Sequence, residues 1–316
     1  MKRESIAAVL AAAVLALGCV GCSSQKNKDS SKAAKNKKNS SASSAEESSA
    51  DELVTDEQSE FTLTAQDGRF ITQAYDLLQS EQYSIRLVYT DPMGNETDIY
   101  RVADGSDYYE LQTNDIGSSG YICVDGNAYE FDNVCGIYRK RDSGRPESLI
   151  ETVVEHALPA TDTNIDPVEA GRYEVEEYTY TGGTYITVMD FYFDKETGLP
   201  VKYVTRYMVE EENGDEGMTE TRTIKEIIFR SGDELIATDG ESRELDRSVF
   251  DTSFLSGLVD FDSMTPEQRL GYCQAIFVTA GVSAEELTAA EMTDEKLKYI
   301  AYEDFTSLVY TYGYDL

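Results

Sequence analysis

The sequence contains one histidine, His156, which is therefore the one candidate for a catalytic imidazole. A Ser-His-Asp or Cys-His catalytic arrangement needs an imidazole within hydrogen-bond reach of a nucleophile. His156 falls on the polar side of a helix expected over residues 145–159, beside Thr152 and Glu155, where a surface histidine would lie. No histidine and cysteine share the spacing of a zinc site. We therefore expect no catalytic residue, no metal and no cofactor.

Oxygen ligands gather in three turns, "DPMGNETD" (91–98), "DGSD" (104–107) and "NGDEG" (213–217). None of them has the spacing of an EF-hand loop, and turn chemistry accounts for all three. Weak calcium binding is the alternative. Among so many acidic residues, no spacing singles out a carboxylate pair for glycoside hydrolysis.

Two cysteines, Cys123 and Cys135, lie on or near adjacent expected strands. In an oxidising compartment they could form a disulfide. A hairpin about the Asp125-Gly126-Asn127 turn, however, sets Cys123 opposite roughly Tyr129. A disulfide and two buried free thiols both stay open, and Cys273 is expected in a core.

The first 22 residues carry a different chemistry. Lys2 and Arg3 precede "SIAAVLAAAVLALG", an apolar run of fourteen that is too short for a stop-transfer helix. The run ends in "LALGCVGCSSQ", which resembles the lipobox of bacterial lipoproteins, where the signal peptide is removed and the new N-terminal cysteine carries a diacylglycerol. Cys19 fits that pattern better than Cys22, and an ordinary secretory signal is the remaining alternative. The resemblance implies anchoring on the extracytoplasmic face of the plasma membrane, because two acyl chains hold a protein there stably.

A polar segment follows the lipobox. Serine, lysine and then acidic residues dominate positions 19–60, with too little apolar surface to offset the entropy of folding. This composition predicts a disordered tether. Residues 1–40 hold eight Lys and Arg against two Asp and Glu, so the rest of the chain carries 19 basic and 58 acidic residues. Such a body excludes nucleic acid as a partner and favours a cationic protein.

Hydrophobic periodicity predicts one helix and then a strand-rich body. The helix covers 67–80, with one apolar stripe made of Phe70, Ile71, Ala74, Leu77 and Leu78. Strands follow as "YSIRLVYT", "ETDIYRVA", "DYYELQT", "GYICVDG", "NAYEFD" and "GIYRK". After the helix over 145–159, strands resume over 172–194, 199–211 and 219–231, with a turn at Gly182-Gly183.

The stretch "FYFDKETGLPVKYVTRYM" (191–208) carries a family resemblance. One strand ends at Asp194, a polar turn runs to Gly198, and the next strand opens at Leu199-Pro200, since proline belongs at a strand start or edge. With the order of elements over residues 64–237 and the segment "VDGNAYEFDNVCGIYRK", this pattern is similar to LolA-like lipoprotein carriers and LppX-type lipoproteins. The resemblance implies an α+β fold, in which a strongly curved antiparallel β half-barrel has helices over its concave face. It also implies a space for acyl chains between sheet and helices, whose ligand-binding residues stay unknown.

The C-terminal part departs from that family pattern and predicts a small helical unit. Thr265-Pro266-Glu267-Gln268 is a capping box with proline at the first helical position, and Gly281 ends the helix. Ser283-Ala284-Glu285-Glu286 is a second capping box. One last helix is expected from Thr293, with an inward face of Leu297, Ile300, Ala301, Phe305, Leu308, Val309 and Tyr312. The expected organisation is a signal peptide (1–18), a lipidated tether (19–60), a half-barrel (61–250) and a helical appendage (251–316).

Three functions of different class are compatible with this organisation. The first is a non-enzymatic, membrane-anchored lipoprotein that binds a lipid or other amphiphile between sheet and helices. Its acidic exterior counts against delivery to an anionic membrane. The second is a protein-interaction or envelope-sensing module with a filled core on the same scaffold. An envelope hydrolase is a remote third.

Overall fold

The computed structural model describes residues 69–79, 82–142, 158–159, 167–182, 185–209, 218–231 and 233–313. The chain divides into two units, Met1–Ser59 and Glu60–Leu316, and every described residue belongs to the second. Cys19, Cys22, His156 and the "NGDEG" turn fall outside the described residues. Within the described ranges, no helix has the length and apolar character needed to cross a membrane.

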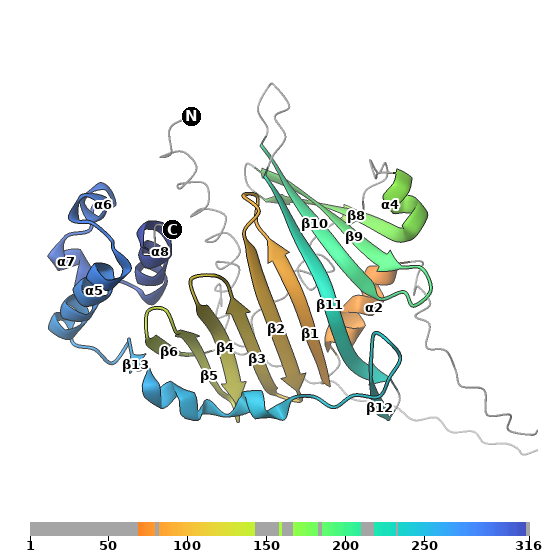
Figure 1. The fold of residues 1–316 in the computed structure, drawn as a ribbon, viewed down its shortest axis with the longest axis horizontal. Coiled ribbons are helices and arrows are strands. Elements are labelled where there is room, and N and C mark those ends of the chain that lie inside the picture. The colour runs from red at the N-terminus through yellow and green to blue at the C-terminus, as the bar shows by residue number, and fades with distance from the viewer. Residues whose placement is uncertain are drawn as a thin grey trace, which may run out of the picture. The chain divides into compact units, whose positions relative to one another are not determined.

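Thirteen strands form one open sheet in the order β13-β6-β5-β4-β3-β2-β1-β11-β10-β9-β8-β7, with β12 paired to β11 (Figure 1). All pairs are antiparallel except β13 with β6, which makes the sheet mixed. The first meander comprises β1 (Gln82–Thr90), β2 (Glu96–Asp104), β3 (Asp107–Thr113), β4 (Ser118–Val124), β5 (Asn127–Asp132) and β6 (Ile137–Arg141). The remaining strands are β7 (Leu158–Pro159), β8 (Tyr173–Gly182), β9 (Tyr185–Asp194), β10 (Pro200–Val209), β11 (Thr219–Ser231), β12 (Glu234–Ala237) and β13 (Val259–Asp260).

One described helix precedes the sheet, one short helix lies between β7 and β8, and four follow the last strand; together with the sheet, these helices make an α+β protein. They are α2 (Phe70–Gln79), α4 (Pro167–Arg172), α5 (Pro266–Ala280), α6 (Ala284–Ala289), α7 (Asp294–Leu297) and α8 (Tyr302–Tyr312). Two 3-10 helices, η1 (Arg247–Phe250) and η2 (Thr252–Gly257), precede the last four. The expected helix over 67–80 is confirmed in its central part as α2.

One face of the sheet, here called the α2 face, packs against α2. Strand alternation sends every second side chain to this face, where Ile71 and Ala74 of α2 join a core cluster that extends from β5 to β8. Phe70 stacks on Phe193 of β9 with 5.5 Å between ring centroids. The carboxylate of Glu176 on β8 accepts hydrogen bonds from the backbone N–H groups of Phe70 (2.5 Å) and Ile71 (3.1 Å). These bonds satisfy two donors that the first turn of a helix leaves open.

The opposite face of β1–β6 and β11 is covered by a strap, residues 233–258. Its apolar side chains fill two clusters, one around Val102 and Ile228 and the other around Ile122 and Phe131. In Figure 1 the strap runs past one end of the first meander, and the ring of Phe254 meets Phe131 at 4.9 Å. Both faces of the first meander are therefore apolar, which explains the absence of a simple inward–outward alternation in β4 and β5.

The turn at 194–198 is confirmed as a hairpin connection between β9 and β10. Asp194 accepts hydrogen bonds from the backbone N–H groups of Glu196 and Thr197, and Gly198 takes a φ of 70° that favours glycine. Pro200 opens β10 beside a register shift.

In the helical unit, both predicted capping boxes are confirmed, at Thr265 and Ser283, and Gly281 forms a left-handed C-cap. The prediction of a single last helix from Thr293 is wrong, because the chain forms two helices, α7 and α8, with a break at Lys298–Ala301. The Ile300 carbonyl accepts from Arg269 of α5 at 3.0 Å, a partner outside the helical ladder. Ala301, expected inward, is an exposed N-cap residue.

The end of the expected helix over 145–159 is also wrong. Leu158 and Pro159 form β7, paired with Thr179 and Tyr178 of β8. An edge strand of two residues tolerates proline, because the N–H that proline lacks is not needed for a hydrogen bond between two central strands. Residues 145–157 lie outside the described part.

Candidate functional site

The α2 face is where an acyl-chain site was expected, and aromatic side chains occupy it. Eight tyrosines and phenylalanines from β1, β3, β4, β8, β9, β10 and β11 keep between 0 % and 5 % of their surface accessible: Tyr83, Tyr108, Tyr121, Tyr178, Phe191, Phe193, Tyr203 and Phe229. A side chain lining an empty, ligand-sized hollow would retain accessible surface toward that hollow. These side chains instead contact one another, as in the stacked pair of Phe191 and Tyr203 at 5.4 Å.

A buried ionic cluster lies on the same face around Glu110 of β3. Its carboxylate accepts hydrogen bonds from Arg101 (2.7 Å), Tyr108 (2.8 Å) and Gln112 (2.7 Å). Burial opposes ionisation of Glu110, but the guanidinium and the other donors outweigh it and hold its pKa below the ordinary value. The antiparallel register places Arg101 directly opposite Glu110, so the strand pairing itself builds the ion pair.

A second cluster repeats this chemistry around Glu220 of β11. Tyr207 donates to its carboxylate at 3.2 Å and Arg222 at 3.3 Å. The guanidinium of Arg222 also lies 4.7 Å from the ring centroid of Tyr89. Burial and the charge of Glu220 raise the pKa values of Tyr89 and Tyr207, so both phenols remain donors. Both clusters compensate buried charge, and neither holds a nucleophile beside a base.

A third cluster lies on the opposite face of β8–β10. Arg206 binds both oxygens of Asp190 (2.5 and 3.0 Å) and one oxygen of Glu177 (3.0 Å). Asp190 is 1 % exposed. Burial and the neighbouring carboxylate of Asp190 raise the pKa of Glu177. The single guanidinium of Arg206 thus binds two carboxylates, on a part of this face that the strap does not cover.

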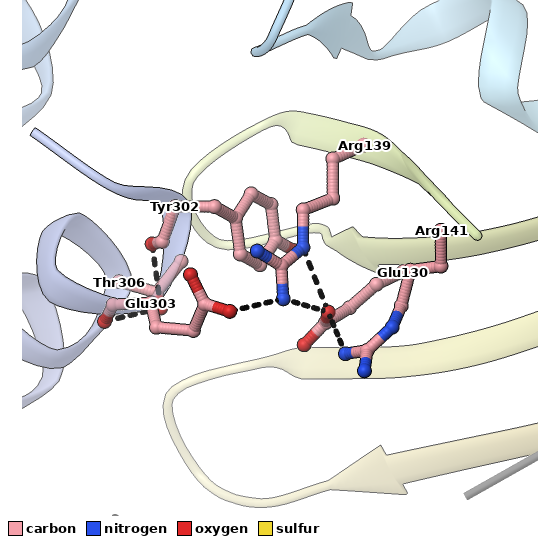
Figure 2. A network of polar contacts seen from close by, with 6 residues as sticks. All are labelled: Glu130, Arg139, Arg141, Tyr302, Glu303 and Thr306. Atoms are coloured by element: carbon pink, nitrogen blue, oxygen red, sulfur yellow. Dashed lines mark hydrogen bonds and ion pairs between the residues drawn. The ribbon is translucent and has the colours of Figure 1, made fainter. Parts of the chain in front are cut away.

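The helical unit joins the sheet through another charged network (Figure 2). Arg139 of β6 lies between Glu130 of β5 and Glu303 of α8, and its guanidinium stacks over the ring of Tyr302 at 4.7 Å. Arg141 adds a second ion pair to Glu130 at 2.9 Å. Deeper in, Tyr310 of α8 donates to Asp132, and Tyr272 of α5 donates to the Cys135 carbonyl at 2.7 Å.

An open groove lies where α7 meets α8, and we call it the Tyr299 groove. It has a volume of about 490 Å³ and is lined by Met292, Glu295, Lys296, Tyr299, Ile300, Ala301 and Asp304. Ile300 is buried beneath it, whereas Tyr299 is 66 % exposed. The groove combines an apolar floor, an aromatic wall and a charged rim.

The two cysteines expected on adjacent strands do not form the disulfide; both thiols are free and buried. Cys123 pairs with Ala128 across β4 and β5 and lies in the cluster of the α2 face. Cys135 follows β5 and belongs to the core of the helical unit with Cys273. Burial raises the pKa of all three thiols, that of Cys273 to about 12, so they are poor nucleophiles.

Of the three acidic turns, for which weak calcium binding was the alternative to turn chemistry, the first engages Asp91 locally: its carboxylate accepts from the backbone N–H groups of Met93 and Asn95. Among the residues that the structure describes, no three His, Cys, Asp or Glu side chains gather in a way that could hold a metal ion. Sequence reasoning missed the Glu110, Glu220 and Asp190 clusters and the Tyr299 groove. The alternation of Arg, Glu and Tyr within β2, β3, β10 and β11 was the available signal, but it needed the strand register to become a set of contacts.

The resemblance to LolA-like proteins stays a prediction from the sequence, based on the order of elements, the segment 124–140 and the turn between Asp194 and Pro200. No model of a known protein family matches this chain, and no curated protein matches it in sequence.

Proposed function

We propose that this protein is a lipid-anchored, non-enzymatic interaction or sensing module, held on the outer face of the bacterial plasma membrane. Its scaffold is a half-barrel whose interior is filled by side chains. The observation that carries the proposal is the packing of the α2 face, where the eight large aromatic side chains keep 5 % or less of their surface accessible.

Support for the half-barrel comes from the continuity of that core. One cluster of buried side chains extends from β5 to β8 on a single face of an open sheet, and α2 contributes to it. A large twisted sheet buries one continuous face well when it curls around that face.

A filled interior favours the interaction module over a lipid carrier. A carrier must hold acyl chains in the space that Tyr203, Phe191 and their neighbours occupy here. The buried charge near that space, at Glu110 and Glu220, would also be costly against an alkyl chain. Recognition is then left to the outer surface.

Native mass spectrometry of residues 60–316, the second compact unit, tests the proposal. After expression in a bacterial host and gentle purification, we expect a single species with the mass of the bare polypeptide. A matched sample washed with detergent should give the same mass. Lipid or another amphiphile that copurifies in stoichiometric amount and disappears on washing would favour the carrier instead.

A further inference from the structure

We propose that the Tyr299 groove binds a lysine or arginine side chain on an exposed segment of a partner protein. This inference rests on the proposed interaction function, and it names both the surface and the chemistry of the partner. Three features of the groove lead to it: its floor, its aromatic wall and its rim.

The floor and wall suit an alkyl stem that ends in a cation. Met292, Ile300 and Ala301 are apolar residues of the lining, and the side chain of Tyr299 beside them is exposed. Lysine and arginine side chains lay their methylene stems on such surface and keep the charged head near water. A cation within about 6 Å of an aromatic ring centroid is attracted to the ring face.

The rim is acidic. Glu295 and Asp304 line the groove, and Glu303 and Asp304 occupy the first turn of α8. Asp304 has no ion pair with any other residue that the structure describes. The one basic side chain in the lining, Lys296, lies 3.6 Å from Glu291, which is not a lining residue. An incoming cation would therefore meet, at Asp304, a carboxylate that no described residue neutralises.

The negative charge of the chain favours a basic protein segment over other possible ligands of the groove. The chain carries a net charge of −33, so a second copy would be repelled, as would an anionic membrane surface. Glu295 already contacts Lys298 at 3.2 Å, but exposed pairs of this kind contribute little and can be exchanged. A basic protein segment is the occupant that complements both rim and floor.

The test is a titration of the full chain, purified in detergent, with the capped peptide acetyl-Gly-Arg-Gly-amide, followed by backbone amide NMR. We expect saturable shifts that concentrate at residues 295–304. Tyr299→Leu should weaken binding about two- to fivefold, since it removes the ring face, whereas Tyr299→Phe should leave it unchanged. Asp304→Asn should weaken it by up to about fivefold. Asp98→Asn on β2, exposed and outside the groove, is the charge-matched control.

Shifts spread evenly over the acidic surface, or equal affinity of Tyr299→Leu and the unaltered chain, would overturn the groove assignment. Equal binding of acetyl-Gly-Glu-Gly-amide would do the same. These results are separable from failure of the proposed function, because the native mass of residues 60–316 does not depend on the groove. A bare mass with no peptide binding would leave an interaction module whose recognition surface lies elsewhere.

Discussion

Arg101 supplies the positive charge that balances the buried carboxylate of Glu110. It faces Glu110 across β2 and β3, and both lie within the core of the α2 face. A buried pair of this kind adds little stability over apolar residues, but loss of one partner leaves an uncompensated charge. The tyrosine and glutamine that also bind Glu110 cannot supply that charge.

Arg101→Met should lower the free energy of unfolding by about 3 kcal/mol, because Glu110 is left buried without its cation. Urea unfolding followed by circular dichroism measures the change. The double variant Arg101→Met/Glu110→Leu should be more stable than Arg101→Met alone. If the double variant were the less stable of the two, Glu110 would have a role beyond this pair.

Glu303 makes the docking of α8 sensitive to acid. Burial opposes its ionisation, but the hydrogen bond from Arg139 prevails, and its pKa lies below the ordinary value of 4.5. A carboxylate with a lowered folded-state pKa stabilises the protein above its unfolded pKa, and that contribution is lost as the pH falls through the folded value. We therefore expect the protection of α8 amides, corrected for intrinsic exchange at each pH, to fall below about pH 4.5, and Glu303→Gln to reduce this loss of protection.

At the scale of elements, α2 depends on a distant strand for its first turn. The helix has no acidic residue in that turn, and Glu176, 106 positions away from Phe70, accepts the free N–H groups instead. Tyr178 holds the same carboxylate at 2.8 Å. Helix and sheet are thus linked by charge as well as by apolar packing.

Glu176→Ala should cost about 1–3 kcal/mol in unfolding free energy, since two backbone donors and one phenol lose a charged acceptor. The matched control is Glu174→Ala on the same strand, whose exposed side chain predicts a change within about 0.5 kcal/mol. Equal effects in urea denaturation would show that α2 does not rely on Glu176.

The contact between the helical unit and the sheet depends on Arg139, which binds side chains of both. Arg139→Ala removes ion pairs to two elements and the stacking on Tyr302, so amide exchange in α8 should become faster than in β1–β4. Lys140→Ala, which changes an exposed neighbour, serves as control. Unaltered exchange in α8 would show that the apolar core and the hydrogen bonds of Tyr310 and Tyr272 hold the helical unit without Arg139.

Sequence patterns predicted the elements better than their contacts. Period-two alternation located β1, turn residues between short strand-like segments located β2 to β6, and Thr265 and Ser283 marked two helix starts, because these signals are local. The break before α8 depends on Arg269, which reaches the Ile300 carbonyl from another helix. Likewise, the pairing of β1 with β11, which brings Tyr89 to the Glu220 cluster, joins strands far apart in the chain. The Glu110 cluster lies within one hairpin, but it needs the exact register of β2 with β3.

For the whole molecule, the proposal requires an anchor at the N-terminus. We expect Cys19→Ser to move the protein from the membrane fraction to the soluble fraction, because the diacylglycerol is no longer attached. Cys22→Ser should remain with the membrane. Fractionation followed by immunoblotting measures the distribution, and the reverse pattern would place the acyl chains on Cys22.

The two ends of the sheet are formed by very short strands, which affects how copies of the protein could associate. The terminal strands β7 and β13 are two residues long each, and β7 closes with Pro159, which has no N–H to donate. A neighbouring molecule that paired with β7 or β13 itself would find only two residues to extend. For the membrane-anchored protein that we propose, these short terminal strands would disfavour strand-to-strand association between neighbouring copies at β7 and β13.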